Sequence, residues 1–505
     1  ATRPAPTSTP APAVPEVTPP AAAEATLVPP SAVPAGPLAQ FGPFDVAAQA
    51  AAIVPAQRGD LDRAGEWNRY TLAVEAAPAT RTLSGSMRLE YVNRDSVALD
   101  RVYFHLYPNL RDLAGQLVVN AVNVDGASVA VNYEARRYLL RVDLPQPLQP
   151  GAPTTISLDF ATTTPINAGK SAYGAFNLQN GVFALASSYP IAAMVRDGVW
   201  DIATPDVRGD LVNSETALYD VTVLAPVDWK IAGTGLIVDG RLDAGKQVAR
   251  IVSGPQRDFM LVLSQLQAVS GTAGDTKVTS YYRPGEDAAG KAALDVAIRS
   301  IELYNRRFGA YPLAEFDLLP VDAGTFLGVE YPGMTLIEHK LYASLGTQFE
   351  TTIAHEVAHQ WWYSTIGNNV QREAWLDEAL ATYSQVVYAE AYMGPEAAQG
   401  QLDIVRESYR RARTAGRDTA VSQPNTAIRS YFSIVYAKGA LFFQALRGRI
   451  GDDAFFRALQ DYYGSHRYGI ATGADLMGAS EAACACELDD LYNSWILSDT
   501  PVDIP

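Results

Sequence analysis

The stretch His355-Glu356-Val357-Ala358-His359 decides how the rest of this chain is interpreted. Histidines four residues apart on a helix lie above one another on one face, close enough to hold a single metal ion. Thr347 and Glu350 have the spacing of a capping box, and apolar residues recur at helical intervals from Ile353 to Trp361. We therefore predict a helix that begins at Thr347 and carries both histidines.

A third candidate ligand follows at a useful distance. Glu378 comes after His359 with eighteen residues between them, within the block Trp375-Leu376-Asp377-Glu378. This block starts a second predicted helix that runs through Tyr388, and residues 367–369 form a loop between the two helices. A helix, a reversal and a second helix can bring Glu378 back to the histidines.

Two imidazoles, one carboxylate and an open fourth position form a catalytic zinc site rather than a closed structural one. We therefore expect one Zn²⁺ per chain, held by His355, His359 and Glu378. Glu356 is placed to act as a general base on a metal-bound water. Two core histidines without a metal are the alternative interpretation, and Glu378 weighs against it.

The composition limits the classes of partner. The 505 residues include 39 Lys and Arg against 55 Asp and Glu, which gives a formal net charge of −16. Such a charge argues against nucleic acid as a partner and against anionic membrane surfaces. No apolar run reaches the length of a transmembrane helix. Cys484 and Cys486 are too close in sequence to form a relaxed disulfide easily, and we interpret them as structural residues.

The sequence predicts three regions. Residues 1–40 are rich in Ala, Pro and Thr and are expected to form a disordered tether. Residues 41–270 show period-two alternation, for example from Met87 to Tyr91, and predict an all-β domain of sandwich type. Residues 271–505 show mainly helical periodicity with a small β portion, and they carry the candidate chemistry. We therefore expect a multidomain α and β protein.

The tether also suggests a location. Segments of this composition often follow a removed signal sequence or a lipid anchor in exported bacterial proteins. We therefore expect an extracytoplasmic protein, secreted or tethered to a surface, with membrane anchoring through an N-terminal lipid or signal segment that this sequence does not contain. A flexible cytoplasmic tail is the alternative.

With these residues in place, the chain resembles the gluzincin zinc aminopeptidases, the family of aminopeptidase N and leukotriene hydrolase. The resemblance rests on H-E-x-x-H, eighteen residues, and then a glutamate within W-L-x-E, and it extends more diffusely over residues 70–505. It implies a β-sandwich followed by a thermolysin-like domain, Zn²⁺ as the cofactor, and peptides with a free N-terminus as substrates.

The resemblance also implies roles for further residues. Tyr436, in Tyr436-Ala437-Lys438-Gly439, matches the family tyrosine that stabilises the oxyanion, and Tyr431 matches a second tyrosine found in some members. Glu330 aligns with the glutamate of the family's G-x-M-E-N block, which binds the substrate amine. The flanking residues differ from that block, with Leu327, Val329 and Tyr331 in place of glycine, methionine and asparagine. The family's acidic or amide residue from the β-domain has no identifiable counterpart.

The activity expected from this resemblance is removal of N-terminal residues from peptides by metal-activated water. The helical C-terminal domain of many members has no counterpart here, so we expect a more open site. Three alternatives stay open: an open-sited zinc endopeptidase, a tethered binding protein with a vestigial metal site, and a zinc hydrolase of non-peptide substrates.

Overall fold

The structure is a computed structural model that describes residues 41–165 and 173–504. The tether predicted for residues 1–40 lies outside the described residues. None of the helices in the described part of the chain combines the length and the apolar character that crossing a bilayer requires.

The largest sheet follows from the period-two pattern. In β2, Met87, Leu89 and Tyr91 are all buried, as the alternation predicts. β1 and β14 pair in parallel, although they lie far apart in the sequence. In spatial order this sheet consists of β16 (Leu236–Asp243), β17 (Lys246–Gln256), β14 (Ala217–Pro226), β1 (Asn68–Ala77), β2 (Thr82–Val92), β8 (Pro153–Thr163), β4 (Gln116–Val124) and β5 (Ala127–Val129).

Smaller sheets share one hydrophobic core with the large sheet. The first contains β15 (Lys230–Gly233), β18 (Leu261–Ser264), β10 (Val182–Leu185) and β9 (Phe176–Gln179). The second contains β11 (Ile191–Ala192), β3 (Leu99–His105), β7 (Leu139–Leu148) and β6 (Asn132–Glu134), and a separate hairpin contains β12 (Val195–Arg196) and β13 (Val199–Trp200). The prediction of an N-terminal β-sandwich-like region is therefore confirmed.

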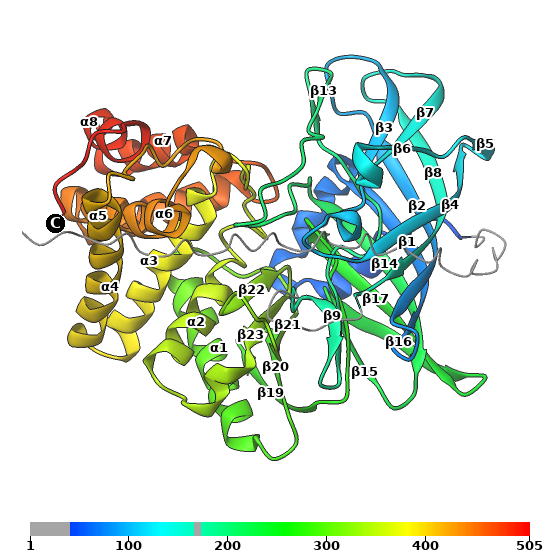
Figure 1. The fold of residues 1–505 in the computed structure, drawn as a ribbon, viewed down its shortest axis with the longest axis horizontal. Coiled ribbons are helices and arrows are strands. Elements are labelled where there is room, and N and C mark those ends of the chain that lie inside the picture. Colours follow the sequence, from blue (N-terminus) through cyan, green and yellow to red (C-terminus); the bar gives the residue numbers. More distant parts are fainter. Residues whose placement is uncertain (1–40, 166–172, 505) are drawn as a thin grey trace, which may run out of the picture. The chain divides into compact units, whose positions relative to one another are not determined.

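A five-stranded sheet connects this region to the helices. Its order is β19 (Gln267–Ala273), β20 (Thr276–Tyr282), β21 (Glu315–Val321), β23 (Met334–Glu338) and β22 (Gly328–Tyr331), so β22 is an edge strand. Helices α1 (Asp287–Arg307) and α2 (Thr347–Ala358) pack against this sheet (Figure 1). A separate apolar cluster joins the sheet to the β15–β18–β10–β9 sheet. The boundary predicted at residue 270 falls within β19.

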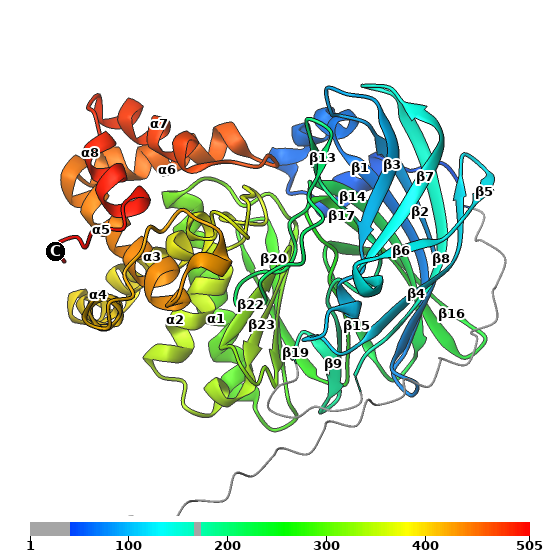
Figure 2. The ribbon, with the colours of Figure 1, turned by 45° about the horizontal axis from the view of Figure 1, so that its top comes forward.

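The remaining chain is mainly helical, as predicted, and Figure 2 shows the helices gathered beside the five-stranded sheet. The α-helices are α1 (Asp287–Arg307), α2 (Thr347–Ala358), α3 (Trp375–Tyr392), α4 (Pro395–Thr414), α5 (Gly439–Ile450), α6 (Asp452–His466), α7 (Gly473–Cys484) and α8 (Asp489–Tyr492). Shorter 3₁₀ segments occupy Ala47–Ala52, Pro55–Glu66, Tyr107–Asn109, Ala135–Arg137, His339–Ala343 and Asn425–Ala427, and π-helical segments occupy Ser433–Lys438 and Asn493–Leu497.

Two local predictions were wrong. The predicted capping box does not form, because Gly346 occupies the N-cap of α2 and Thr347 is already inside the helix. Cys484 and Cys486 are joined by a disulfide, with their Cα atoms 5.2 Å apart. Ala485 between them adopts a left-handed conformation, with φ of 52°, which turns both side chains to the same side of the chain.

One buried arginine ties the β-rich region to the helical region. Arg257, at the end of β17, donates hydrogen bonds to the carbonyl oxygens of Tyr363 at 2.8 Å and of Ser214 at 3.0 Å, and to that of Gly469. Burial lowers the pKa of its guanidinium to about 10, so the group stays charged at neutral pH. Three carbonyl oxygens compensate this buried charge.

Candidate active site

The three predicted metal ligands converge between α2 and α3. The facing Nε2 atoms of His355 and His359 are 3.2 Å apart, and Oε2 of Glu378 lies 3.4 Å from each of them. Ligands placed about 2.0–2.1 Å from a tetrahedral ion are separated by roughly 3.3–3.4 Å. The donor set and its spacing therefore fit a zinc ion in a three-protein-ligand site.

Neighbouring groups orient these ligands. Nδ1 of His359 lies 3.0 Å from the carbonyl oxygen of Trp362, so this nitrogen carries the proton and leaves Nε2 free to bind a metal. Burial alone would raise the pKa of Glu378, but hydrogen bonds from His355 and His359 outweigh it and lower the pKa to about 2. Glu378 is therefore an ionised ligand at neutral pH.

The predicted general base lies beside this cluster. Glu356 is 5 % exposed and lines the same pocket as the metal ligands. Burial, with smaller contributions from the charges of Glu378 and Asp210, raises the pKa of its carboxyl to about 8, although the charge of His359 opposes this rise. A bound cation would offset these negative charges. The site therefore suits a divalent metal ion electrostatically.

Glu330 lies on the edge strand β22, as the sequence suggested, and its carboxylate reaches the metal cluster. Its Oε1 is 3.8 Å from Nδ1 of His359 and is buried with no hydrogen-bond partner among the described residues. Burial raises the pKa of Glu330 to about 8; the charge of His359 opposes this rise, and those of Glu378 and Glu356 add to it. The unpartnered Oε1 beside the metal ligands is suited to accept a hydrogen bond from an ammonium group.

A second carboxylate at this position was missed by the sequence analysis. Asp210 belongs to the connection between β13 and β14, and its side chain hydrogen-bonds to that of Glu330. Burial, followed by the charge of Glu330, raises the pKa of Asp210 well above its usual value. Asp210 lies in a loop without periodicity or a recognisable motif, so only the fold reveals its proximity to Glu330.

The two tyrosines occupy different positions. Tyr436 is on the π-helical segment Ser433–Lys438, lines the pocket, and donates a hydrogen bond to Oε1 of Glu378. Its ring stacks on His355 at 6.1 Å between ring centroids. Tyr431 does not line the pocket, and its buried hydroxyl has no partner among the described residues. The structure therefore places Tyr436, but not Tyr431, beside the metal ligands.

These residues line a pocket of about 590 Å³. Leu327, Val329 and Tyr331, which differ from the family's G-x-M-E-N block, take different positions relative to this pocket. Leu327 is 45 % exposed on the pocket wall, and Val329 is buried. The hydroxyl of Tyr331 hydrogen-bonds to that of Tyr173 at 3.0 Å. β22 therefore presents Glu330 to the pocket while Tyr331 helps to anchor the strand.

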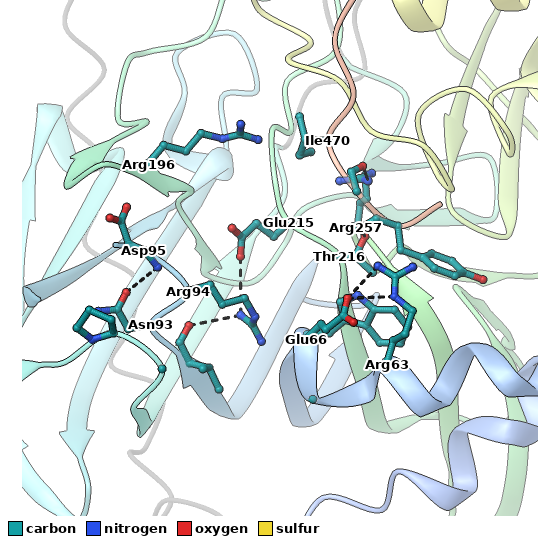
Figure 3. Close-up of a pocket in the computed structure, with 17 residues that line it drawn as sticks. Arg63, Glu66, Asn93, Arg94, Asp95, Arg196, Glu215, Thr216, Arg257 and Ile470 are labelled. Carbon is teal, nitrogen blue, oxygen red and sulfur yellow. Dashed lines mark hydrogen bonds and ion pairs between the residues drawn. The ribbon is translucent and has the colours of Figure 1, made fainter. Parts of the chain in front are cut away.

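A second cavity, of about 700 Å³, lies elsewhere, between the start of β1 and residues 468–470 (Figure 3). Several charged side chains that line this cavity form ion pairs with one another: Arg63 pairs with Glu66 at 2.8 Å, and Arg94 lies 3.9 Å from Glu215. Among the described residues, the groups able to hold a metal ion are at the first pocket and none is here. The candidate active site is therefore the smaller pocket.

Comparisons with known proteins agree with this site. Residues 292–495 match the model described as the peptidase family M1 domain. The chain is 25% identical over 301 residues to "Probable aminopeptidase 2" of Sulfurisphaera tokodaii, covering 56% of this chain and 38% of that protein. It is 25% identical over 321 residues to "Aminopeptidase N" of Streptomyces lividans, covering 58% and 37%. The chain thus spans well under half the length of these relatives.

Solved structures resemble the chain over most of its length. An M1 zinc metallopeptidase from Deinococcus radiodurans aligns with a TM-score of 0.63 at 20% identity, covering 87% of this chain and 95% of that one. A mutant of that enzyme, described as bound to a Tyr-Ser-Ala substrate, aligns with a TM-score of 0.65 at 19% identity, covering 86% and 95%. These likenesses establish the two-part fold.

The family match spans all of the predicted site residues. The structure brings the three metal ligands, Glu356, Tyr436 and Glu330 together in one pocket, whereas Tyr431 does not line it. The resemblance to the gluzincin aminopeptidases stated from the sequence is confirmed, because residues 292–495 of this chain match the peptidase family M1 domain and its relatives carry aminopeptidase names.

Proposed function

We propose that this protein is a zinc-dependent aminopeptidase that removes N-terminal residues from peptides. The observation that carries this proposal is the position of Glu330, whose buried and unpartnered Oε1 lies beside the three metal ligands. A free α-ammonium group bound there would place the first peptide bond next to the metal ligands. The names of the relatives support the same activity.

The chain's own residues supply the remaining chemistry. His355, His359 and Glu378 would hold one Zn²⁺, which, when bound, supplies a Lewis acid for hydrolysis. Glu356 takes a proton from the attacking water and delivers it to the leaving nitrogen. The hydroxyl of Tyr436 donates a hydrogen bond to the oxyanion that develops at the scissile carbonyl.

Asp210 and Glu330 form the amine-binding end of the pocket. Burial and the charge of Glu330 raise the pKa of Asp210 well above its usual value, and burial raises that of Glu330, so the pair favours holding a proton in the free protein. An incoming ammonium can displace that proton and pair with both groups. The edge of β22 offers backbone groups along which an extended peptide can lie.

Paired substrates test this proposal. Amino-acid anilides with a free amine and their N-acetylated forms should be compared with the wild-type protein and with Glu330→Gln. We expect cleavage of the free forms alone, and a loss of about 10-fold or more in kcat/KM in the variant. Equal cleavage of acetylated substrates would instead establish an endopeptidase, and cleavage of neither form, nor of longer peptides, would favour a binding protein.

We further propose that the protein acts outside the cytoplasm, held near a surface by its N-terminal segment. The Ala-, Pro- and Thr-rich composition of residues 1–40 and the disulfide between Cys484 and Cys486 support this location. Fractionation of the native host should find the protein outside the cytoplasm with the disulfide intact. Recovery from the cytoplasm with free thiols would exclude it.

A further inference from the structure

The connection between β13 and β14, residues 201–216, crosses from the β-rich region to the catalytic pocket, and we call it the strap. Residues 207–210 of the strap line the catalytic pocket. Its last two residues, Glu215 and Thr216, line the second cavity (Figure 3). Asp210 therefore reaches Glu330 only because the strap follows this particular course.

One side chain holds the strap at the catalytic pocket through both ends of its amide. Oε1 of Gln371 accepts a hydrogen bond from the backbone N–H of Asp206 at 2.7 Å. Nε2 of Gln371 donates to the carbonyl oxygen of Asp210 at 2.8 Å and lies 3.4 Å from that of Asp206. Gln371 lies in the loop between α2 and α3, so the segment that joins the two metal-binding helices also holds the strap.

Other contacts flank this attachment. Arg208 donates to the carbonyl oxygens of Ile428 at 2.7 Å and Asn425 at 2.5 Å. Next to it, Gly209 packs so closely that an added Cβ would lie 2.0 Å from the hydroxyl oxygen of Tyr431. Arg208 and Gly209 thus fix the strap on one side of Asp210, while Gln371 contacts the backbone of Asp210 itself.

Asp210 needs such an attachment for an electrostatic reason. Two carboxylates within hydrogen-bond distance repel one another whenever both are ionised. The strap is a connection of irregular structure, which this repulsion could displace unless its backbone is held. A neutral amide that accepts from one strap residue and donates to another can hold it without adding charge to the amine-binding end.

We propose that Gln371 is a positioning residue for substrate binding: it fixes the backbone of Asp210 and so keeps that carboxylate against Glu330. The role rests on the proposed aminopeptidase function, since it assigns how the amine-binding end is held together. Gln371 does not line the catalytic pocket and is not a metal ligand. Its loss should therefore affect binding of the free amine rather than the chemical step.

The test uses graded substitutions on the full chain. Gln371→Leu removes both hydrogen bonds at similar volume, while Gln371→Glu keeps the acceptor for Asp206 and loses the donor to Asp210. Gln247→Leu is a matched control, because Nε2 of Gln247 also donates to two backbone carbonyl oxygens, those of Pro226 and Trp229. Gln247 lies on β17 and does not line the catalytic pocket. Steady-state kinetics on free and N-acetylated substrates, with zinc content, are measured for each.

We expect Gln371→Leu to raise KM for free-amine substrates about 10-fold with kcat and zinc content nearly unchanged, and Gln371→Glu to have an intermediate effect. Gln247→Leu should leave KM unchanged. The decisive comparison is the double variant: once Asp210→Asn has raised KM, adding Gln371→Leu should raise it no further, because Gln371 acts through Asp210.

Additive effects in the double variant would overturn the positioning role, as would a loss confined to kcat or an unchanged KM in Gln371→Leu. Wild-type protein that cleaves free and acetylated substrates equally would instead overturn the proposed function, and the role of Gln371 with it.

Limited proteolysis gives a readout that does not depend on activity. A loosened strap should be cut by trypsin after Arg208 faster in Gln371→Leu than in Gln247→Leu. Equal rates would show that Gln371 does not hold the strap.

Discussion

At the scale of single residues, Tyr436 makes the sharpest prediction about chemistry. Its hydroxyl lies against Glu378, within the pocket, where it can reach a developing oxyanion. Tyr436→Phe removes only that hydroxyl, so we expect kcat to fall about 10²- to 10³-fold with KM nearly unchanged. Steady-state kinetics on a free amino-acid anilide measure this. A change in KM alone would show that Tyr436 binds substrate instead.

Asp258 makes a prediction about pH. Burial raises its pKa to about 6, although hydrogen bonds from Phe259, Tyr189 and Ser187 lower it in part. Between about pH 4 and 6 the unfolded chain loses this proton while the folded protein keeps it. The free energy of unfolding therefore falls as the pH rises through this range, and it stops falling once Asp258 is ionised in the folded protein as well, above about pH 6. Relative to Asp258→Asn, the free energy of unfolding of the wild-type protein should fall by about 3 kcal/mol over this pH range.

Thermal unfolding of both proteins at a series of pH values measures this difference. Because both proteins contain the same other titrating groups, the contributions of those groups cancel in the difference between the two melting temperatures. A difference in melting temperature that does not change between pH 4.5 and 7.5 would contradict the raised pKa of Asp258.

The sequence could predict the site residues that carry a motif. His355, Glu356, His359 and Glu378 are recognisable because helical geometry fixes which spacings can share one metal ion. Asp210 could not be predicted, because its position depends on the course of the strap over the fold. Tyr431 illustrates the reverse case: its spacing matched a family position, yet it packs on Gly209 outside the pocket.

At the scale of elements, Gly439 sets how closely α5 approaches the helix that carries Glu378. A Cβ at this position would lie 2.5 Å from the Cβ of Ala379 on α3. Gly439→Ala should therefore force α5 away from α3 and destabilise the protein by about 1–3 kcal/mol. It should also lower kcat, because Tyr436 lies on the turn that leads into α5.

Gly448, on the same helix, is the matched control. It is exposed, and an added Cβ there meets no atom within 4 Å. Gly448→Ala should stabilise the protein by up to about 1 kcal/mol, since alanine favours the helix. Denaturant unfolding compares the two variants. Equal effects would show that the contact between α3 and α5 tolerates a methyl group.

The elements themselves were largely predictable where periodicity is strong. Buried Ile353 and Val357 on α2 and the alternation in β2 reflect simple amphipathic patterns. The start of α2 was placed correctly for a wrong reason, because Gly346 rather than a side-chain cap precedes it. The π-helical turn that carries Tyr436 was not predicted, since one extra residue in a turn leaves little trace in the pattern.

At the scale of the whole molecule, Arg257 is the contact whose loss should matter most. Its guanidinium satisfies the carbonyl oxygens of Ser214, Tyr363 and Gly469, which belong to the strap and to two loops of the helical region. Arg257→Met removes the arginine donor from the carbonyl oxygens of Ser214 and Tyr363, while that of Gly469 keeps the N–H of Gly367, and the substitution should cost about 3 kcal/mol or more. Arg411→Met, whose side chain is 73% exposed, should change stability by no more than about 0.5 kcal/mol.

Chemical unfolding monitored by circular dichroism compares the two substitutions. Similar midpoints for Arg257→Met and Arg411→Met would show that other contacts hold the two regions together.

The order of regions could be read from the sequence, but their connection could not. The change from period two to helical periodicity separates the β-rich half from the helical half. The strands β19 and β20 continue the β pattern across that change while pairing into the five-stranded sheet beside the helices, so composition alone does not mark the junction. Arg257 likewise contacts residues 106 and 212 positions away, a separation that no local pattern encodes.

The most direct test of the account measures zinc content and anilide cleavage on the same samples of three proteins. The wild-type protein should hold about one zinc and cleave, Glu356→Gln should hold about one zinc and not cleave, and Glu378→Ala should lose both. Undiminished cleavage by Glu356→Gln, or full zinc content and turnover in Glu378→Ala, would contradict the assignment of Glu356 as the base and of His355, His359 and Glu378 as the metal site.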